Sequence, residues 1–185
     1  MLHGKKIKLR ALEPDDIDAL YQWENDVSIW KVSGTLLPFS KHFLKKYIAD
    51  SHHDIYLDKQ LRLVIDLTTP LSFGEGQGVR SIGCVDLFDF DAKNKRAGIG
   101  ILIGEKNARL NGYASEALKI LINYAFNILA LHQLYCNITA DNKQSLNLFK
   151  KHKFKIIGLK KDWIFAEGKW LNEYTLQRIN KIGKN

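Results

Sequence analysis

The sequence predicts a single α/β domain whose mixed, twisted sheet carries helices on both faces. The 185-residue length suits one domain, and no internal repeat or linker divides the chain. Strand-like and helix-like patterns alternate along it. The predicted order is one strand, two helices, three strands, a helix, a strand, a helix and then strands to the C-terminus, so a meander precedes β-α-β crossovers. We expect the domain to span residues 1–185, with its core at about 7–179.

The N-terminal part predicts one strand and two helices. Residues 7–12 alternate apolar and polar side chains, which is the period-two pattern of a strand. Pro14, Asp15 and Asp16 then mark a helix start, because proline fits the first turn and acidic side chains favour the positive end of the helix dipole. A second helix is predicted over 40–50 from its apolar face.

Three strands follow, over 61–67, 81–90 and 96–104, each an apolar run. The turn-rich segment 91–95 predicts a hairpin between the last two. A glycine-rich run lies within 68–80, between the first two strands. It lacks the Gly-Lys-Ser/Thr ending of a phosphate loop and no helical pattern follows it, so we expect a flexible loop.

The C-terminal half begins with the strongest predicted helix, 111–129, whose apolar side chains recur at helical spacing. A strand is predicted over 133–139. Asp141 and Gln144 have the spacing of a capping pair, which predicts a short helix ending near residue 151. The remaining strands are expected over 154–159, 163–166 and 170–179, the last two joined by a turn.

Composition narrows the function. Lys plus Arg number 28 and Asp plus Glu 20, so the net charge of +8 favours an anionic partner such as a phosphate-rich cofactor or nucleic acid. No apolar run approaches the ~20 residues needed to span a bilayer, and the N-terminus lacks the apolar stretch of a signal peptide. We therefore expect a cytoplasmic protein that binds no membrane. Cys84 and Cys136 lie in apolar stretches and are expected to be free thiols, and the six histidines show no metal-ligand spacing.

The most informative junction joins the strand at 96–104 to the helix at 111–129. Small residues at the helix start let backbone N–H groups converge on a phosphate, aided by the helix dipole, and an arginine adds a forked cation. These residue types predict a pyrophosphate site. The junction consists of Arg109, Leu110, Asn111, Gly112, Tyr113, Ala114 and Ser115.

The wider pattern resembles a known family. Arg-x-x-Gly-x-Ala at 109–114, followed by Glu-Ala-Leu, closely resembles the acetyl-CoA signature of the GNAT N-acetyltransferase superfamily. The block from Asn142 through Ser145 and Phe149 to Phe154 resembles that family's Asn-x-x-Ala/Ser-x-x-x-Tyr-x-x-x-Gly-Phe segment. Residues 7–10 and 23–26 are similar to the ribosomal-protein-alanine and polyamine acetyltransferase branch. The resemblance runs over nearly the whole chain.

This resemblance implies a GNAT-like domain with acetyl-CoA as co-substrate. The strand segment Ile101, Leu102 and Ile103 would diverge from the parallel strand at 133–139 and leave a cleft for the pantetheine arm. The pyrophosphate would bind at 109–115, with Asn142 as a further cofactor contact. A primary amine would attack the thioester directly, and the acceptor could be a protein N-terminus, an amino sugar or a small amine.

The resemblance also singles out catalytic candidates, and this chain departs from the family at several of them. Phe149 stands where many members have a tyrosine as general acid, so the candidate acid is Ser145 or a water molecule that it holds. Spacing predicts that Asn142, Ser145 and Phe149 share one helix face.

Several residues are candidates for the general base. Gly98 and Ile164 stand where the two branches carry a glutamate, which leaves Asp86, Asp89 and Glu24 as candidate bases. Strand alternation predicts that Asp86 and Asp89 point to opposite faces, so that at most one faces a pocket.

Two other functions remain open at this stage. The same fold could bind acyl-CoA without turnover, since Phe149, Gly98 and Ile164 replace polar residues of the family. A basic α/β module that binds nucleic acid is the other alternative, although its lysine-rich segment 150–155 has the composition of a solvated face. A homodimer is also open.

Overall fold

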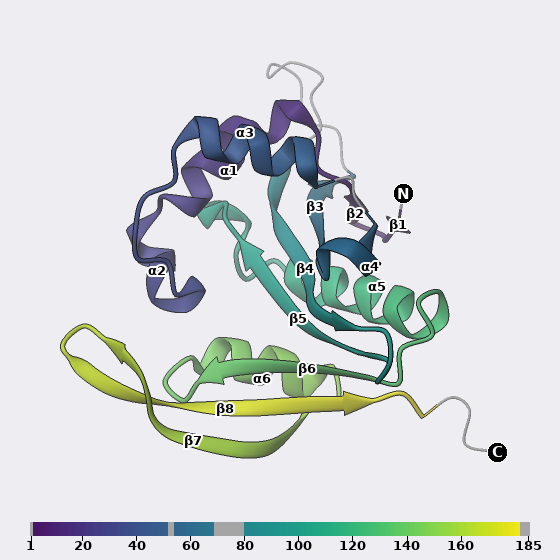
Figure 1. Cartoon of the computed structure of the whole chain (residues 1–185), viewed down its shortest axis with the longest axis vertical. Coiled ribbons are helices and arrows are strands. Elements are labelled where there is room, and N and C mark those ends of the chain that lie inside the picture. The colour runs from purple at the N-terminus through teal and green to yellow at the C-terminus, as the bar shows by residue number, and fades with distance from the viewer. Residues whose placement is uncertain (1, 52–53, 69–79, 182–185) are drawn as a thin grey trace.

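A single eight-stranded sheet organises the computed structural model of the chain, which describes residues 2–51, 54–68 and 80–181 (Figure 1). Neighbouring strands are antiparallel except β5 and β6, so the sheet is mixed, as the sequence predicts. In sheet order the strands are β1 (Leu2–His3), β2 (Ile7–Arg10), β3 (Leu61–Leu67), β4 (Ser81–Asp91), β5 (Arg96–Ile103), β6 (Gln133–Thr139), β8 (Lys169–Ile179) and β7 (Lys155–Ala166).

Helices cover both faces of this sheet, because its strands send alternate side chains to opposite sides. Leu63 and Ile65 of β3 join the core beneath α5 and α6, whereas Val64 packs with α1 and α3 on the other face. Figure 1 shows α5 and the α1–α3 pair on either side of β3 and β4. The helices are α1 (Ile17–Glu24), α2 (Val27–Ser33), α3 (Lys41–Asp50), α4 (Ile55–Asp58), α5 (Tyr113–Asn127) and α6 (Lys143–Lys151), with 3-10 turns at Pro14–Asp16 and Lys106–Ala108.

Most predicted elements are confirmed, with differences at their ends. The predicted strands at 61–67 and 133–139 have the bounds of β3 and β6. The helix predicted over 111–129 begins later, at Tyr113, because Gly112 has a φ of 86° that no helical residue adopts. The strands expected at 154–159 and 163–166 form one strand, β7, whose register shifts between Lys160 and Ile164. The glycine-rich segment predicted as a loop lies largely outside the described residues.

One predicted cap is wrong. Asn142, not Asp141, caps α6, because the Asn142 Oδ1 atom accepts the backbone N–H of Ser145 at 3.0 Å. Gln144, the other residue of the predicted capping pair, already lies within α6. An asparagine at this position satisfies one of the N–H groups that a helix start leaves without an intrahelical partner.

The parallel pair β5 and β6 separates along its length. Register pairs join only residues 96–98 of β5 to 133–135 of β6. Beyond them β5 continues to pair with β4 up to Ile103, and β6 continues to pair with β8 up to Thr139. The backbone edges of 99–103 and 136–139 that face each other are therefore not joined in the sheet. This gap in the ladder is the feature that positions the candidate site.

Candidate active site

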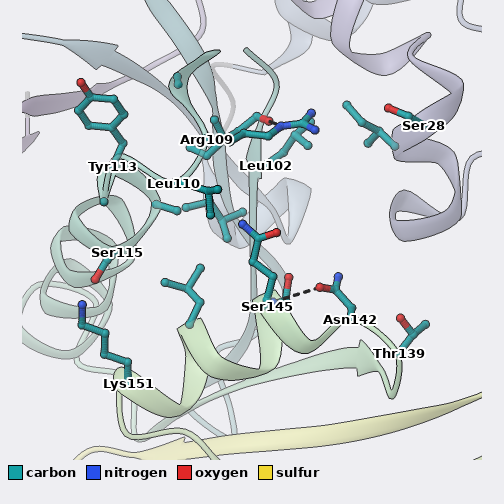
Figure 2. Close-up of a pocket in the computed structure, with 18 of the residues that line it drawn as sticks. Ser28, Leu102, Arg109, Leu110, Tyr113, Ser115, Thr139, Asn142, Ser145 and Lys151 are labelled. Atoms are coloured by element: carbon teal, nitrogen blue, oxygen red, sulfur yellow. Dashed lines mark hydrogen bonds between the residues drawn. The ribbon is translucent and has the colours of Figure 1, made fainter. Parts of the chain in front are cut away.

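A cavity of about 570 Å³ opens where β5 and β6 diverge. Figure 2 shows its walls, which come from the loop before α5, the first turn of α5, the start of α6 and Ser28 of α2. Of the eleven predicted cofactor contacts, ten line this cavity: Ile101, Leu102, Ile103, Arg109, Leu110, Gly112, Tyr113, Ala114, Ser115 and Asn142. The eleventh, Asn111, is exposed, and its side-chain amide donates to the backbone carbonyls of Asn107 and Arg109.

The first turn of α5 can hold an anion. The first intrahelical bond runs from the Glu116 N–H to the Gly112 carbonyl, so the N–H groups of the preceding residues have no partner within the helix. The helix dipole adds positive potential at this end. Leu110 and Gly112 both have positive φ, and a Cβ built on Gly112 would meet no atom within 4 Å. The space above the turn is thus open to a phosphate group.

Arg109 has a different local role from the one its sequence position predicts. Its Nε atom donates to the Ile103 carbonyl at 3.0 Å, and Nη2 lies 3.4 Å from the Gly104 carbonyl. The guanidinium therefore satisfies acceptors at the end of the diverging strand. In Figure 2 it points along the wall toward Ser28, away from Ser115. Its positive charge remains at the cavity.

A polar contact joins the first turn of α5 to the residue that follows α6. Ser115 Oγ and His152 Nε2 lie 2.9 Å apart. Burial, together with Arg178, Lys151 and Lys119, lowers the pKa of His152, so this imidazole is neutral at pH 7. Lys151 also lines the cavity and supplies a second cation near the start of α5.

Ser145 and Phe149 differ in what they contact. Both lie in α6, four residues apart, a spacing that places them on the same side of the helix. Ser145 lines the cavity, as do Leu148 and Lys151. Phe149 does not line it: its side chain is buried, and its ring meets Phe154 edge to face at 5.1 Å between centroids. Ser145 is therefore the hydroxyl that α6 presents to the cavity, within the part of the chain that the structure describes.

Two of the candidate bases meet on the α1–α3 face of the sheet, through a residue that the sequence did not single out. Arg62 of β3 pairs with Asp86 Oδ1 at 2.7 Å through Nε and with Glu24 Oε1 at 2.8 Å through Nη1. Burial is the largest single effect and disfavours the charge on Arg62, but Asp86 together with Tyr47, Cys84 and Glu24 outweighs it and holds the arginine pKa well above its ordinary value. The ring of Tyr47 lies 5.4 Å from the guanidinium, and burial raises the pKa of that phenol to about 12.

Asp86 lies beside the diverging part of β5. It is the register partner of Gly100, and its Oδ2 atom would lie 4.0 Å from a Cβ built there. Gly98 has a different constraint, because a Cβ there would come within 2.2 Å of the Phe88 ring. The phenyl ring thus occupies the space where the resembling polyamine branch has a glutamate.

Asp89 lies elsewhere. A β-bulge follows Phe88, and Asp89 has a φ of 49°, so strand alternation does not hold there. Its Oδ2 atom accepts the Tyr135 hydroxyl at 3.0 Å, and the Tyr135 ring packs on Phe88. The bulge therefore removes the alternation on which the prediction of opposite faces for Asp86 and Asp89 rests. Asp89 is exposed at the end where β5 and β6 still pair.

Other chemistries find no support among the described residues. Cys84 and Cys136 are free and buried, as expected, and burial raises the pKa of the Cys136 thiol to about 12 and that of Cys84 further. Neither is a thiolate at neutral pH. No group of three or more His, Cys, Asp or Glu side chains in residues 2–51, 54–68 and 80–181 has a metal-binding arrangement. None of the helices in those ranges is long and apolar enough to cross a membrane.

Comparisons with known proteins place the chain among N-acetyltransferases. The N-acetyltransferase p20 of Bacillus licheniformis is 26% identical to it over 183 residues, which cover 97% of this chain and 96% of the relative. The spermidine N(1)-acetyltransferase of Escherichia coli (strain K12) is 25% identical over 172 residues, covering 93% and 85%.

Solved structures show the same fold. The crystal structure of spermidine N-acetyltransferase from Vibrio cholerae in complex with CoA and spermine matches with a TM-score of 0.81 at 20% identity, over 94% of this chain and 95% of that one. The profile of the acetyltransferase (GNAT) domain family matches residues 6–155, most of the 185-residue chain. On this match the chain belongs to the GNAT acetyltransferase domain family.

Proposed function

We propose that this protein transfers the acetyl group of acetyl-CoA to a primary amine by direct attack. One observation carries the proposal: the unpaired edges of β5 and β6 open beside the first turn of α5. Extended backbone edges can pair with an amide-containing chain, and free N–H groups at a helix start can bind a pyrophosphate. Pantetheine and pyrophosphate are the two parts of CoA that match these features.

We assign each side chain a role in the reaction from its position at or beside the cavity. Acetyl-CoA supplies a thioester that an unprotonated amine attacks. Asp86 Oδ2, beside Gly100, accepts the ammonium proton, directly or through water. An N–H group on the unpaired edge of β5 polarises the thioester carbonyl. The Ser145 hydroxyl hydrogen-bonds the leaving thiolate or relays a proton to it.

The acceptor is proposed to approach from the side of α1 and α2. Ser28 and Ile29 line this side of the cavity, while α5 and α6 enclose the other. Arg62 neutralises part of the charge of Glu24 and Asp86, so this face does not present free carboxylates from that pair. The whole chain has a net charge of +8, which repels a polycation. We therefore expect an acceptor with one ammonium group, such as a peptide N-terminus, an amino sugar or a small amine.

An amine panel tests the proposal. The purified chain is assayed for CoA thiol release with spermidine, an amino sugar, a small monoamine and a short peptide with a free N-terminus. We expect acetyl-CoA-dependent thiol release, with the highest kcat/KM for an acceptor that carries one ammonium. Spermidine as the best acceptor would contradict the charge argument. Acetyl-CoA binding without thiol release for any amine would show a binding protein without turnover.

We also propose a homodimer and a cytoplasmic location. Trp163, Phe165 and Trp170 form an exposed aromatic group near the turn between β7 and β8, and β7 is the last strand of the sheet. Exposed apolar clusters of this kind mark protein interfaces. The free thiols of Cys84 and Cys136 are in keeping with a reducing compartment.

A further inference from the structure

A second cavity, of about 660 Å³, lies outside the candidate active site. It is formed by the C-terminal half of α5, the end of α6, the start of β7 and the end of β8. Its apolar residues are Phe126, Phe154, Ile157 and Ile179; the two phenylalanines are buried and the two isoleucines are partly exposed. The volume is in the range of small-molecule sites.

The charge of this cavity is one-sided. Five of its lining residues are cations and none is an aspartate or glutamate: Lys150, Lys153, Lys155, Arg178 and Lys181. Surface lysines and arginines usually mix with acids, so a concave site with a single sign of charge concentrates anions.

Arg178 is fixed at the centre of this group. Its Nη1 atom donates to the His152 carbonyl at 2.9 Å, and its guanidinium lies 5.4 Å from the Phe126 ring centroid. None of the carboxylates in the described part of the chain forms an ion pair with it. Burial lowers its pKa, as expected for a cation that has lost water without gaining a carboxylate. An anion in the cavity would supply the missing countercharge.

Lys153 gives a second, independent observation. It ends the turn after α6 with a φ of 65°, the left-handed conformation that glycine adopts without cost. A lysine there retains backbone strain, and its side chain lines the cavity. Strain kept at one position is a reason to look for a function of the side chain.

This cavity is separate from the site between β5 and β6. Ser115 lines the first cavity and Asn123 the second, and at 1.5 Å per residue they lie about 12 Å apart along α5. The two cavities also use different residues of α6, Lys151 and Lys150 respectively. The lining sets have no residue in common.

We propose that this basic cavity binds a small ligand that carries two or more phosphate charges on a planar aromatic body, the chemistry of a nucleotide. The lysines and Arg178 bind the phosphates, and the apolar side chains of the cavity pack against the planar body. A concave site of this size suits a small ligand better than an extended polymer. The proposal goes beyond the acetyl transfer and does not depend on it.

Calorimetric titration of the full chain with ATP tests this site, with one equivalent of CoA per chain present so that CoA occupies the first cavity without filling the second. We expect ATP to bind one site per chain and pyrophosphate to bind more weakly, because it lacks the planar body. Lys153→Glu combined with Lys155→Glu should weaken ATP binding at least ~10-fold and leave CoA affinity unchanged. Lys45→Glu combined with Lys46→Glu, the same charge change at two exposed positions of α3, is the matched control and should bind ATP normally.

Lys153→Gly distinguishes the effect of the lysine side chain on ligand binding from the effect of its backbone conformation on stability. It should raise the melting temperature by about 2–4 °C by removing the strain, and still weaken ATP binding. Displacement of CoA by ATP, an equal loss in the Lys45→Glu and Lys46→Glu control, or equal affinity for ATP and pyrophosphate would overturn the proposal. If the chain binds no CoA, the same ATP titrations without CoA still test nucleotide binding in the second cavity. A failure of the acetyl-transfer proposal therefore does not decide the proposal for the second cavity.

Discussion

At the scale of single residues, Asp86 carries the sharpest prediction. Asp86→Asn removes the carboxylate beside Gly100 and should lower kcat by about 10²–10⁴-fold, the range of general base catalysis. The KM for acetyl-CoA should change little, because Asp86 does not line the cofactor cavity. Steady-state kinetics measures both quantities.

Glu24→Gln is the matched control, because it removes the other partner of Arg62 without touching Gly100. If the carboxylates act only by holding Arg62, the two variants should lose similar activity. A large loss in Glu24→Gln alone would make Glu24 the base. Asp89→Asn should keep nearly full activity, since Asp89 bonds Tyr135 at the paired end of β5 and β6.

Ser145 carries a more modest prediction. Ser145→Ala should lower kcat, at the low end of the ~10²–10⁴-fold range for general acids, because a thiolate with a pKa near 8.5 needs little help to leave. Cofactor affinity should stay nearly intact. Wild-type turnover with the preferred amine would exclude an acid role. Phe149→Tyr is not expected to restore the loss, because its hydroxyl would be placed toward the core beside Phe154.

Arg62 shows why some site residues escape sequence reasoning. The candidates Asp86 and Glu24 could be selected by residue type, and Ser145 by motif. Their connection depends on the register of β3 with β4, which places Arg62 opposite Asp86, and on the packing of α1 over that pair. The one feature of the sequence that pointed to Arg62 was the presence of an arginine within an apolar strand. Because its partners are distant in sequence, the pattern alone did not reveal the cluster.

At the scale of elements, the first turn of α5 yields a test of the phosphate site. Asparagine and aspartate both tolerate a left-handed φ, so Gly112→Asn and Gly112→Asp impose similar backbone costs. Only the aspartate adds a negative charge where the pyrophosphate is proposed to bind. Its CoA affinity should be at least ~10-fold weaker than that of Gly112→Asn, about 1.4 kcal/mol or more. Equal affinities by calorimetry would place the phosphates elsewhere.

The start of α1 depends on a buried ion network. Arg10 donates to Asp16 and Asp66 at 2.7 Å, and both carboxylates are almost completely buried. Arg10→Leu would leave Asp16 without a cation and Asp66 with only the more distant Lys8, at 3.8 Å, and should lower the free energy of unfolding by about 3–5 kcal/mol in urea titration. The exposed pair of Lys41 and Asp18 is the control, and Lys41→Ala should leave the midpoint unchanged. A similar midpoint for both variants would contradict the role assigned to Arg10.

The same network sets a pH dependence. Burial disfavours the Asp16 carboxylate, but its bonds to Arg10 and to the Glu13 N–H outweigh burial and lower its pKa. The folded state therefore binds the proton less readily than the unfolded state. This stabilisation is complete above the unfolded pKa near 3.9 and is lost as pH falls through the lower folded value. Arg10→Leu should show a smaller loss of stability over that acidic range, measured by thermal melts.

The sequence predicted helices and strands correctly where their hydrophobic periodicity extended over many residues. The strands β3 and β6 and the helix α5 have strong periodicity, so their types and near bounds followed from the sequence. The two-residue β1 and the four-residue α4 are too short to show any period, and α2 was missed with them. The bulge at Asp89 and the single long β7 depend on pairing across strands, which no local pattern encodes.

At the scale of the whole molecule, charge was predictable and its distribution was not. The excess of Lys and Arg indicated an anionic partner. The fold places part of that charge around the second cavity, because the end of α6 and the end of β8 meet there. The lysine-rich segment 150–155 looked like a solvated face, but Lys150, Lys153 and Lys155 converge with Arg178. Convergence of this kind requires the tertiary fold.

The hairpin of β7 and β8 carries the last prediction. Phe165 and Trp170 are 62% and 59% exposed, and their ring centroids lie 5.2 Å apart at the end of a strand pair that few other elements cover. A second copy related by a two-fold axis would bury the same group on both chains. Sedimentation equilibrium should give twice the mass of the chain, and Phe165→Ser with Trp170→Ser should give the monomer. Leu57→Ser, at another exposed apolar site, should remain dimeric. A wild-type monomer, or a double variant that stays dimeric, would exclude the hairpin as the interface.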